Sequence, residues 1–473
     1  MRLRFLSALS LVAGGVLIGV ALVGAPVLAV SGFLDQGEVP GHPWDQQIRD
    51  NTRGLEDRGR ETFRYNTFGS EQFFGGTLEL HRAIEGAKFG DGVGDGVSPK
   101  TALAVGLKVD MDALPSAVVD AVKAGKVNLD DPAVTLTLLQ LGAVVGVEGI
   151  FNNPNDATQG LKSVGVTCAL CHSTVDDAFA PGIGHRLDGW ANQDLNVGVI
   201  LSLSPNLEGL AAFLNAGGGN LHAEDVKGVL TSWGPGKFDA ELNLDGKAVN
   251  PHQMTDGVET GTNVPGATLI PNAFGLAGHN LHTWGGGWGT VTYWNAFVAN
   301  LEMNGVGRFF DPRLSDATKY PIAAAHKDDN KPSAGDDRIT QWLGALQFYQ
   351  LSLPTPKAPQ GSFDAQAAAR GVAVFNGQGG CASCHVPPLF TEPGWNAHKA
   401  ADIGIDDFQA SRSPDDSYRT AALAGRLFNR KRGFYHDGRF GTLMDVVNHY
   451  DTHFKLNLSD GQKADLVEYL KSI

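Results

Sequence analysis

Two copies of a Cys-x-x-Cys-His motif constrain this chain more than any other feature of its sequence. The copies are Cys168, Cys171 and His172, and Cys381, Cys384 and His385. On a helical turn, positions i, i+3 and i+4 share one face, so both sulfurs can form thioethers with the vinyl groups of a haem while the histidine nitrogen reaches its iron. The chain has 14 histidines among 473 residues. A histidine after both cysteine pairs by accident therefore has a probability of about one in a thousand.

Two other chemistries use paired cysteines, and neither fits the surrounding sequence well. Zinc ribbons usually draw four ligands from a compact stretch, whereas these two pairs lie far apart in the chain. The flanks of the motifs also lack the βαβ pattern of a thioredoxin-like redox pair. We therefore expect two covalently bound haem c groups, which use all four cysteines, with His172 and His385 as iron ligands.

The N-terminus has the pattern of an export signal. Arg2 and Arg4 precede an uncharged run over residues 5–34 that is rich in Leu, Val, Ala and Gly. The sequence Ala29-Val30-Ser31 resembles a cleavage site, yet the apolar run is also long enough to span a bilayer. Residues 1–32 are thus predicted to be a signal peptide or an N-terminal membrane anchor. The protein is expected in the periplasm or another extracytoplasmic space, tethered to the inner membrane if the segment is retained.

Charge excludes one class of partner. Lys and Arg number 37 against 51 Asp and Glu, which gives a formal net charge of -14. A chain this acidic is a poor candidate for binding nucleic acid.

The domain organisation follows from one linker-like stretch and from helical periodicity. Residues 352–362 contain three prolines and no apolar periodicity, which is typical of a connector. We predict an N-terminal haem domain with extensions over 33–352 and a C-terminal cytochrome c domain over 353–473. Apolar spacing and capping boxes predict helices over 133–147, 442–450 and 459–473. The expected fold is mainly α, with two cytochrome c-like haem domains and long loop-rich insertions.

The C-terminal part resembles a known group of dihaem proteins. Residues 367–384 look like the first helix and haem loop of cytochrome c, and residues 418–420, 433–440 and 442–450 resemble the C-terminal domain of the bacterial dihaem cytochrome c peroxidase and MauG-like superfamily. Residues 59–64, 163–167 and 185–190 resemble its rubber oxygenase-like branch, which the chain approaches most closely. The chain departs from the compact peroxidases by its long stretches before Cys168 and between the motifs.

The resemblance implies a sixth ligand for the second haem. The superfamily's ligand position falls on Tyr450, where the peroxidases carry Met and MauG-like members carry Tyr. The predicted helix also places Tyr450 on its apolar stripe, with Met444 and His449 flanking that stripe. His449 and His453 remain alternatives, because bis-histidine ligation occurs among the oxygenase relatives.

No residue at a fixed distance in sequence from the first motif identifies itself as the sixth ligand of the first haem. The histidine candidates are His185, His222, His252, His279, His282 and His326. Aromatic residues concentrate over 274–297 and could wall an apolar distal pocket, as in the rubber oxygenase-like proteins, or form ordinary core. Trp284 and Phe297 are the residues we select for that pocket. A peroxidase also needs a distal acid or base, for which Glu302 is one of several candidates.

Residues 90–97, Gly-Asp-Gly-Val-Gly-Asp-Gly-Val, could form a calcium loop, although they lack the full EF-hand pattern and fit a flexible turn better.

The sequence favours an exported haem-dependent oxidoreductase, peroxidase-like or dioxygenase-like. Electrons would pass through the C-terminal haem, and oxygen or peroxide would react at the N-terminal haem. Its expected partners are a small cytochrome or similar redox protein and an organic substrate that the sequence does not name. The alternatives are a pure electron carrier with both haems six-coordinate and a gas sensor without turnover.

Overall fold

The computed structural model describes residues 42–261, 263–333 and 335–473. Asn51–Ile473 form one compact unit, and the start of the chain up to Asp50 is counted apart from it. The predicted signal peptide or anchor, residues 1–32, lies outside the described residues. No helix in the described ranges is long and apolar enough to cross a membrane.

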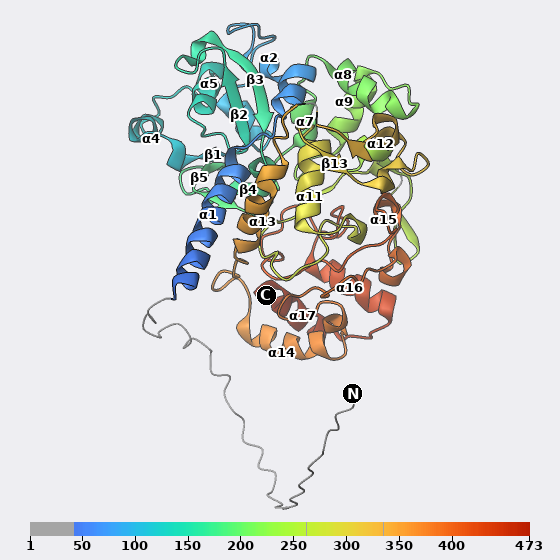
Figure 1. Cartoon of the computed structure of the whole chain (residues 1–473). Coiled ribbons are helices and arrows are strands. Elements are labelled where there is room, and N and C mark those ends of the chain that lie inside the picture. Colours follow the sequence, from blue (N-terminus) through green and yellow to red (C-terminus); the bar gives the residue numbers. More distant parts are fainter. Residues whose placement is uncertain (1–41, 262, 334) are drawn as a thin grey trace, which may run out of the picture. The chain divides into compact units, whose positions relative to one another are not determined.

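The described chain is mainly helical, with long loops between the helices, as the sequence predicts (Figure 1). The α-helices are α1 (Pro43–Tyr65), α2 (Leu80–Glu85), α3 (Pro99–Ala104), α4 (Ser116–Lys123), α5 (Pro132–Gln140), α6 (Ala169–His172), α7 (Val197–Leu201), α8 (Leu207–Leu214), α9 (Ala223–Ser232), α10 (Leu242–Asp245), α11 (Val291–Phe297), α12 (Pro321–His326), α13 (Leu343–Ser352), α14 (Ala365–Asn376), α15 (Phe408–Arg412), α16 (Leu443–Phe454) and α17 (Asp460–Ser472). Two short segments are π-helical, η1 (Gln72–Thr77) and η6 (Val298–Glu302). The 3-10 turns are η2 (Met111–Ala113), η3 (Ala157–Gln159), η4 (Asn215–Gly217), η5 (Gly286–Trp288), η7 (Pro312–Ser315), η8 (Thr340–Trp342), η9 (Cys381–Ser383) and η10 (Ala400–Ile403).

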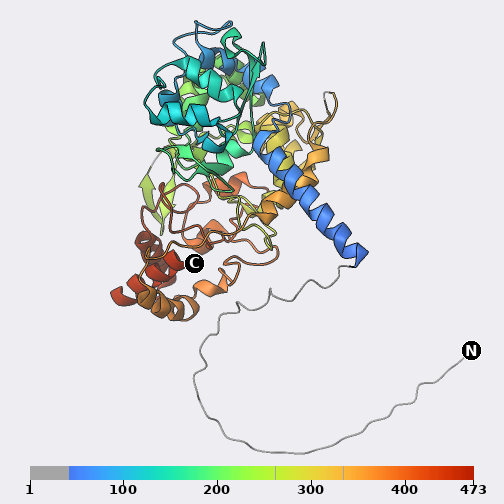
Figure 2. The ribbon, with the colours of Figure 1, turned by 90° about the vertical axis from the view of Figure 1, so that its left-hand side faces the viewer.

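The β-structure within the described ranges consists of small two-stranded ribbons. Their strands are β1 (Val109–Asp110), β2 (Val147–Phe151), β3 (Leu161–Val166), β4 (Ser173–Val175), β5 (Ile183–Gly184), β6 (Arg186–Asp188), β7 (Lys237–Phe238), β8 (Val249–Asn250), β9 (Gln253–Thr255), β10 (Val258–Gly261), β11 (Val264–Pro265), β12 (Thr268–Leu269), β13 (Phe309–Phe310) and β14 (Asn330–Lys331). Strands β1 and β5 pair in parallel, and the pairs β2–β3, β4–β6, β7–β12, β8–β11, β9–β10 and β13–β14 are antiparallel. The longest ribbon, β2–β3, runs almost directly into the first cysteine motif and packs on α2, α5 and η1 (Figure 2).

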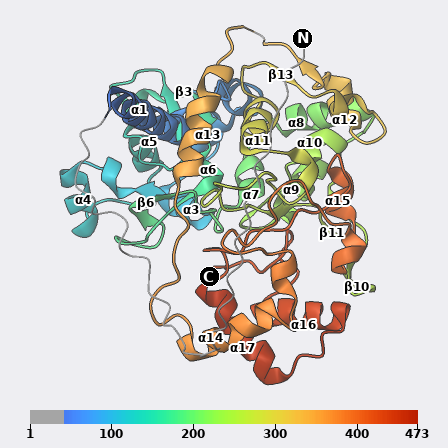
Figure 3. The ribbon, with the colours of Figure 1, turned by 60° about the horizontal axis from the view of Figure 1, so that its bottom comes forward.

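Helices α14, α16 and α17 pack together around the second motif (Figure 3). Asp364 caps α14 by accepting from the backbone of its first turn, and Ser459 and Thr442 form the capping boxes that the sequence predicts for α17 and α16. Helices α14 and α17 cross closely at Gly371, where a Cβ atom would lie 2.2 Å from the backbone oxygen of Asp465. A glycine at this crossing is therefore a steric requirement.

One predicted helix is too long. The apolar run over 133–147 is helical only in α5, which ends at Gln140. Gly142 then adopts a φ of +63°, and the chain turns into strand β2 at Val147. A short buried apolar run fits a helix or a strand equally well, and the turn at Gly142 decides between them.

Candidate haem cavities

Each Cys-x-x-Cys-His motif lines its own large cavity. The first cavity, of about 500 Å³, is lined by Cys168, Cys171 and His172. The second cavity, of about 440 Å³, is lined by Cys381, Cys384 and His385. Both volumes lie in the ordinary range for cofactor sites, roughly 300–1,000 Å³. The two cavities are therefore large enough for one haem each, and the paired thiols face into them.

Both motif histidines are held in the state that a metal ligand requires. The Nδ1 atom of His172 lies 3.0 Å from the backbone oxygen of Pro271, and Nδ1 of His385 lies 3.1 Å from the backbone oxygen of Phe390. Burial lowers the pKa of His172 to about 4 and also lowers the pKa of His385. A neutral imidazole that donates from Nδ1 keeps its Nε2 lone pair free for iron.

The four thiols are protonated in their buried settings. Burial raises the pKa of Cys168 and Cys171 to about 12 and that of Cys381 to about 11, and it also raises the pKa of Cys384. Thioether attachment to a haem is the expectation that follows from the spacing of the motifs and from the cavities that they line.

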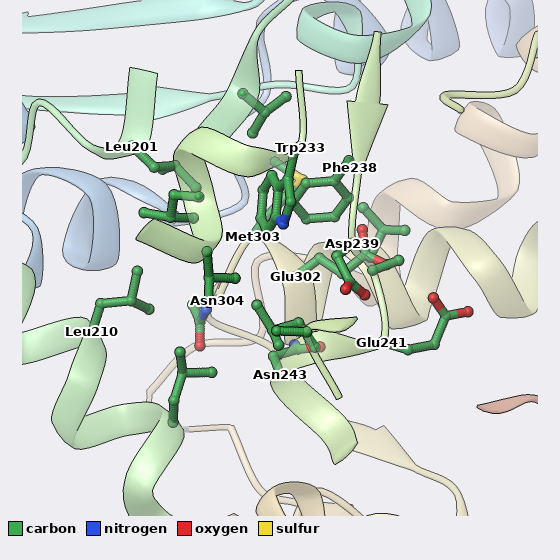
Figure 4. Close-up of a pocket in the computed structure, with 18 of the residues that line it drawn as sticks. Leu201, Leu210, Trp233, Phe238, Asp239, Glu241, Asn243, Glu302, Met303 and Asn304 are labelled. Atoms are coloured by element: carbon green, nitrogen blue, oxygen red, sulfur yellow. The ribbon is translucent and has the colours of Figure 1, made fainter. Parts of the chain in front are cut away.

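Glu302 lies on the wall of the first cavity at the end of the π-helical turn η6 (Figure 4). Its Oε1 oxygen is buried and has no hydrogen-bond partner among the described residues. Burial, reinforced by the nearby carboxylates of Glu241 and Asp239, raises the pKa of Glu302 well above its usual value. Burial therefore favours the protonated form of this side chain, which faces the cavity.

The acidic groups near Glu302 are organised by one buried arginine. Arg412, fully buried, binds Asp239 at 2.7 Å and Asp245 at 2.8 Å. Asp239 and Asp245 both lie on the wall of the first cavity. Glu241, whose pKa burial raises to about 7, lies on the same wall, and Figure 4 shows it with Asp239. Arg412 thus holds two of the acidic side chains of this wall in place.

The structure places the two selected aromatic residues differently. Trp284 lines both cavities, and its Nε1 atom donates to the backbone oxygen of Leu269 at 2.9 Å. Phe297 does not line either cavity. It is fully buried behind Trp294, with stacked rings 4.7 Å apart, and Trp294 is the residue that faces the first cavity. The expectation for Phe297 is corrected to a supporting core residue, because the helical turn of α11 rotates it inward.

No histidine candidate for the first haem lies on the described wall of the first cavity, where His172 is the only histidine. The candidates are engaged elsewhere: His185 binds Asp112, His252 binds Glu259, His326 stacks on Phe213, His222 caps α9, and His279 and His282 pack beside each other. Met303 and Asn304, which follow Glu302, also line this wall but are not among the residues predicted from the sequence. The sequence signal that could have found them is their position directly after Glu302.

Tyr450 lines the second cavity, along with Leu443, Val446 and Val447 from the same face of α16. Burial raises the pKa of Tyr450 to about 12. The alternative ligands do not line this cavity. His449 is buried rather than flanking, because its Nε2 lies 2.8 Å from the backbone oxygen of Ile403 and its Nδ1 lies 3.2 Å from Asp256.

His453 also binds outside the second cavity, where its Nε2 lies 3.1 Å from the backbone oxygen of Asp402. Ligation by Tyr450 stays a prediction, and of the three candidates its side chain is the one on the cavity wall.

The predicted calcium loop, residues 90–97, folds against the buried Glu85. Across the described ranges, the cluster of three metal-ligating side chains is Cys384, Glu392 and His398, which does not include this loop. A calcium ion at residues 90–97 remains a prediction.

Comparisons with known proteins relate the chain to one group. No family model matches it. The methylamine utilization protein MauG of Methylorubrum extorquens is 25% identical over 222 residues, which cover 39% of this chain and 61% of MauG. The matched part thus spans less than two thirds of that relative.

Three solved structures share a weak similarity with the chain. Hydrazine synthase of Kuenenia stuttgartiensis is 17% identical, covering 46% of this chain and 78% of that one, with a TM-score of 0.30. A MauG-like protein associated with microbial copper homeostasis is 18% identical, with coverages of 48% and 77% and a TM-score of 0.29. The dihaem peroxidase BthA of Burkholderia thailandensis is 18% identical, with coverages of 50% and 77% and a TM-score of 0.30. The similarity to MauG agrees with the paired Cys-x-x-Cys-His motifs and with the resemblance of the C-terminal part to MauG-like dihaem proteins.

Proposed function

We propose that this protein is an exported dihaem c-type oxidoreductase that reduces peroxide or activates oxygen in the first cavity. A haem held in the second cavity would supply the electrons. The proposal rests on Glu302, a buried carboxyl group on the wall of the first cavity whose Oε1 atom has no hydrogen-bond partner among the described residues and whose pKa burial raises.

The position of Glu302 suits a general acid and base. A haem attached at Cys168 and Cys171 supplies an iron that can bind oxygen or peroxide and exchange electrons. Reduction of one hydrogen peroxide to two waters consumes two electrons and two protons. Glu302 can give a proton to an oxygen atom in the cavity and take one back from water, because burial raises the pKa of its carboxyl group well above the usual value.

Other wall residues exclude water and connect the two cavities. The wall of the first cavity opposite the acidic groups is apolar, with Leu201, Leu210 and Trp233 (Figure 4). Trp284 and Pro271 line both cavities. In this proposal Trp284 is the aromatic group between the two cavities, and Tyr450 would be the ligand that the second cavity offers to a bound haem.

The proposed partners follow from the two roles, electron entry at the second cavity and peroxide or oxygen chemistry at the first. A small cytochrome or similar redox protein would exchange electrons with the second haem, and an organic substrate would be oxidised when peroxide or oxygen is reduced. The acidic composition, with a net charge of -14, favours a partner with a basic docking face. The N-terminal export pattern supports a location of the protein in the periplasm or another extracytoplasmic space.

Met303 supports one competing function. Its side chain lies on the wall of the first cavity, and a thioether ligand there would make the first haem six-coordinate. With Tyr450 on the second iron, the protein would then be an electron carrier without an open site.

Electron paramagnetic resonance of the ferric holoprotein separates the two functions. The proposed function predicts one high-spin and one low-spin signal, and peroxide should consume the high-spin signal. Two low-spin signals that stay indifferent to peroxide, before and after partial reduction, would instead establish the carrier. Met303→Leu is the matched variant, because it should open the first iron in a carrier and leave the spectrum of an oxidoreductase unchanged.

A further inference from the structure

Three arginines on the wall of the second cavity have no carboxylate partner. Arg419, Arg426 and Arg430 line this cavity, and none of them forms an ion pair with any described residue. The chain treats its other buried arginines near the cavities differently. Arg412 binds two carboxylates, and Arg439 also binds two, so the absence of partners is specific to the cavity wall.

The polar atoms of these arginines are only partly satisfied. Arg419 donates from Nε to the backbone oxygen of Thr283, but its Nη1 atom is buried without a partner among the described residues. The Nε atom of Arg430 is also buried and has no hydrogen-bond partner among the described residues. Arg426 donates to the backbone oxygens of Ala424 and Phe274, which carry no net charge. Unpaired buried donors of this kind are costly unless a ligand satisfies them.

The three side chains remain charged and repel one another. Burial lowers the pKa of Arg419 and Arg430 to about 10, and burial together with repulsion from these two lowers the pKa of Arg426 to about 9. His279 and His282 lie nearby but add no charge at neutral pH, because burial holds their pKa values at about 4 and 3. The wall therefore carries three cations and needs an anion.

We propose that Arg419, Arg426 and Arg430 bind the two propionate carboxylates of the haem in the second cavity. This inference rests on the proposed function, because it requires a haem attached at Cys381 and Cys384. Guanidinium groups bind carboxylates with paired, charge-assisted hydrogen bonds, and two carboxylates would offset most of the charge of three arginines.

Arg419 also contacts the segment that carries Trp284, the aromatic residue that lines both cavities. The backbone nitrogen of Arg419 donates to the backbone oxygen of Trp284 at 3.2 Å, and its Nε atom binds the neighbouring Thr283. A propionate on Arg419 therefore also holds the segment that carries Trp284. The arginines bind the haem edge and position the aromatic group between the two sites.

The test uses the holoprotein with both haems attached and compares four variants, of which Arg426→Gln repeats the loss of charge at a second arginine. Arg430→Gln removes one cation from the cavity wall, and Arg430→Lys keeps the charge but loses the planar guanidinium. Arg432→Gln is the matched control, because it makes the same charge change two residues away, where the side chain binds Asp194 and Gln193. The readouts are the propionate bending modes in resonance Raman spectra and the midpoint potential of each haem at neutral pH.

Arg430→Gln should shift the propionate modes of one haem and lower the potential of the second haem alone, because a nearby positive charge disfavours ferric iron. Arg430→Lys should restore most of the potential, and Arg432→Gln should resemble the parent protein. Unchanged modes and potentials in Arg430→Gln and in the second variant Arg426→Gln would overturn the inference.

Two further results separate this inference from other outcomes. If added phosphate or succinate shifts the same modes in the parent protein, then a small anion from solution occupies the arginines and the propionate assignment is overturned. A lack of haem on the peptide that contains Cys381 and Cys384, found by mass spectrometry, would overturn the proposed function itself. Attached haem with unaltered variants would overturn the arginine assignment alone.

Discussion

Replacement of Glu302 by glutamine should separate proton transfer from every other property of the first cavity. The amide has the shape of the carboxylic acid but cannot pass on a proton. Loss of a general acid or base typically lowers a rate by about 100- to 10,000-fold. Glu241 lines the same cavity, and its pKa of about 7 leaves it about half protonated at neutral pH. It can substitute in part, so we expect a fall near the lower end, about 100-fold, or ~2.7 kcal/mol of transition-state stabilisation.

The assay is stopped-flow reaction of the holoprotein with hydrogen peroxide, with the second-order rate constant as the readout. Glu148→Gln is the matched control, because burial raises the pKa of Glu148 to about 7 as well, yet this residue lines neither cavity. A Glu302→Gln rate within threefold of the parent rate, with both haems attached, would refute the assignment of proton transfer to this residue.

The same Glu302→Gln substitution that lowers the reaction rate should raise the stability of the folded protein at high pH. Because the pKa of Glu302 is raised above its usual 4.5, the folded state binds a proton that the unfolded state releases. Its contribution is therefore favourable at low pH and is lost as the pH rises above about 4.5, by ~1.4 kcal/mol per pH unit until Glu302 itself ionises. Glu302→Gln removes this loss, so the variant should resist urea better than the parent at pH 8 and equally well at pH 4. Lower resistance at both pH values would show that the carboxyl group is structural.

Substitutions at four further positions probe the ligand, the packing and the charge network. Tyr450→Phe should convert the second haem to high spin, and Tyr450→Met should raise its potential; an unaltered spectrum would exclude tyrosine ligation. Gly371→Ala should cost ~1–3 kcal/mol in urea unfolding, because the new methyl group meets the backbone of Asp465 at 2.2 Å; parent-like stability would contradict the close crossing of α14 and α17. Arg412→Leu should cost ~3–5 kcal/mol by leaving two buried carboxylates unpaired, and a neutral effect would show that those carboxyls take up protons instead. Burial opposes ionisation of Asp194, but hydrogen bonds from two lysines prevail and lower its pKa from 3.8 to about 2, so Asp194→Asn should lose ~2 kcal/mol at neutral pH; that difference should vanish as the pH falls from about 4 to about 2, and a constant difference would exclude the charge effect.

The sequence predicts the parts of the sites that depend on local spacing. Each cysteine motif lies within one turn of chain, and the apolar stripe of 442–450 predicts which face of α16 meets the second cavity. Capping boxes at Thr442 and Ser459 likewise act over three residues. These features need no knowledge of how distant segments meet.

The remaining parts depend on how distant segments pack. His449 is buried because a loop near Ile403 and another near Asp256 cover its flank of α16, and neither loop is near it in sequence. Phe297 and Glu302 are close in the chain, yet the second lines the first cavity and the first does not, and the helix changes from α to π between them. Propensity does not reveal where that change occurs, and one inserted residue rotates every later side chain.

The cavity walls have a consequence for the biogenesis of the protein. The wall of the first cavity includes Ile322, far downstream of Cys168, and the wall of the second includes Leu466 and Leu470 of α17. Neither pocket can close during synthesis until these downstream segments have emerged. A haem attached before these downstream segments fold would therefore meet motifs whose cavity walls are still incomplete.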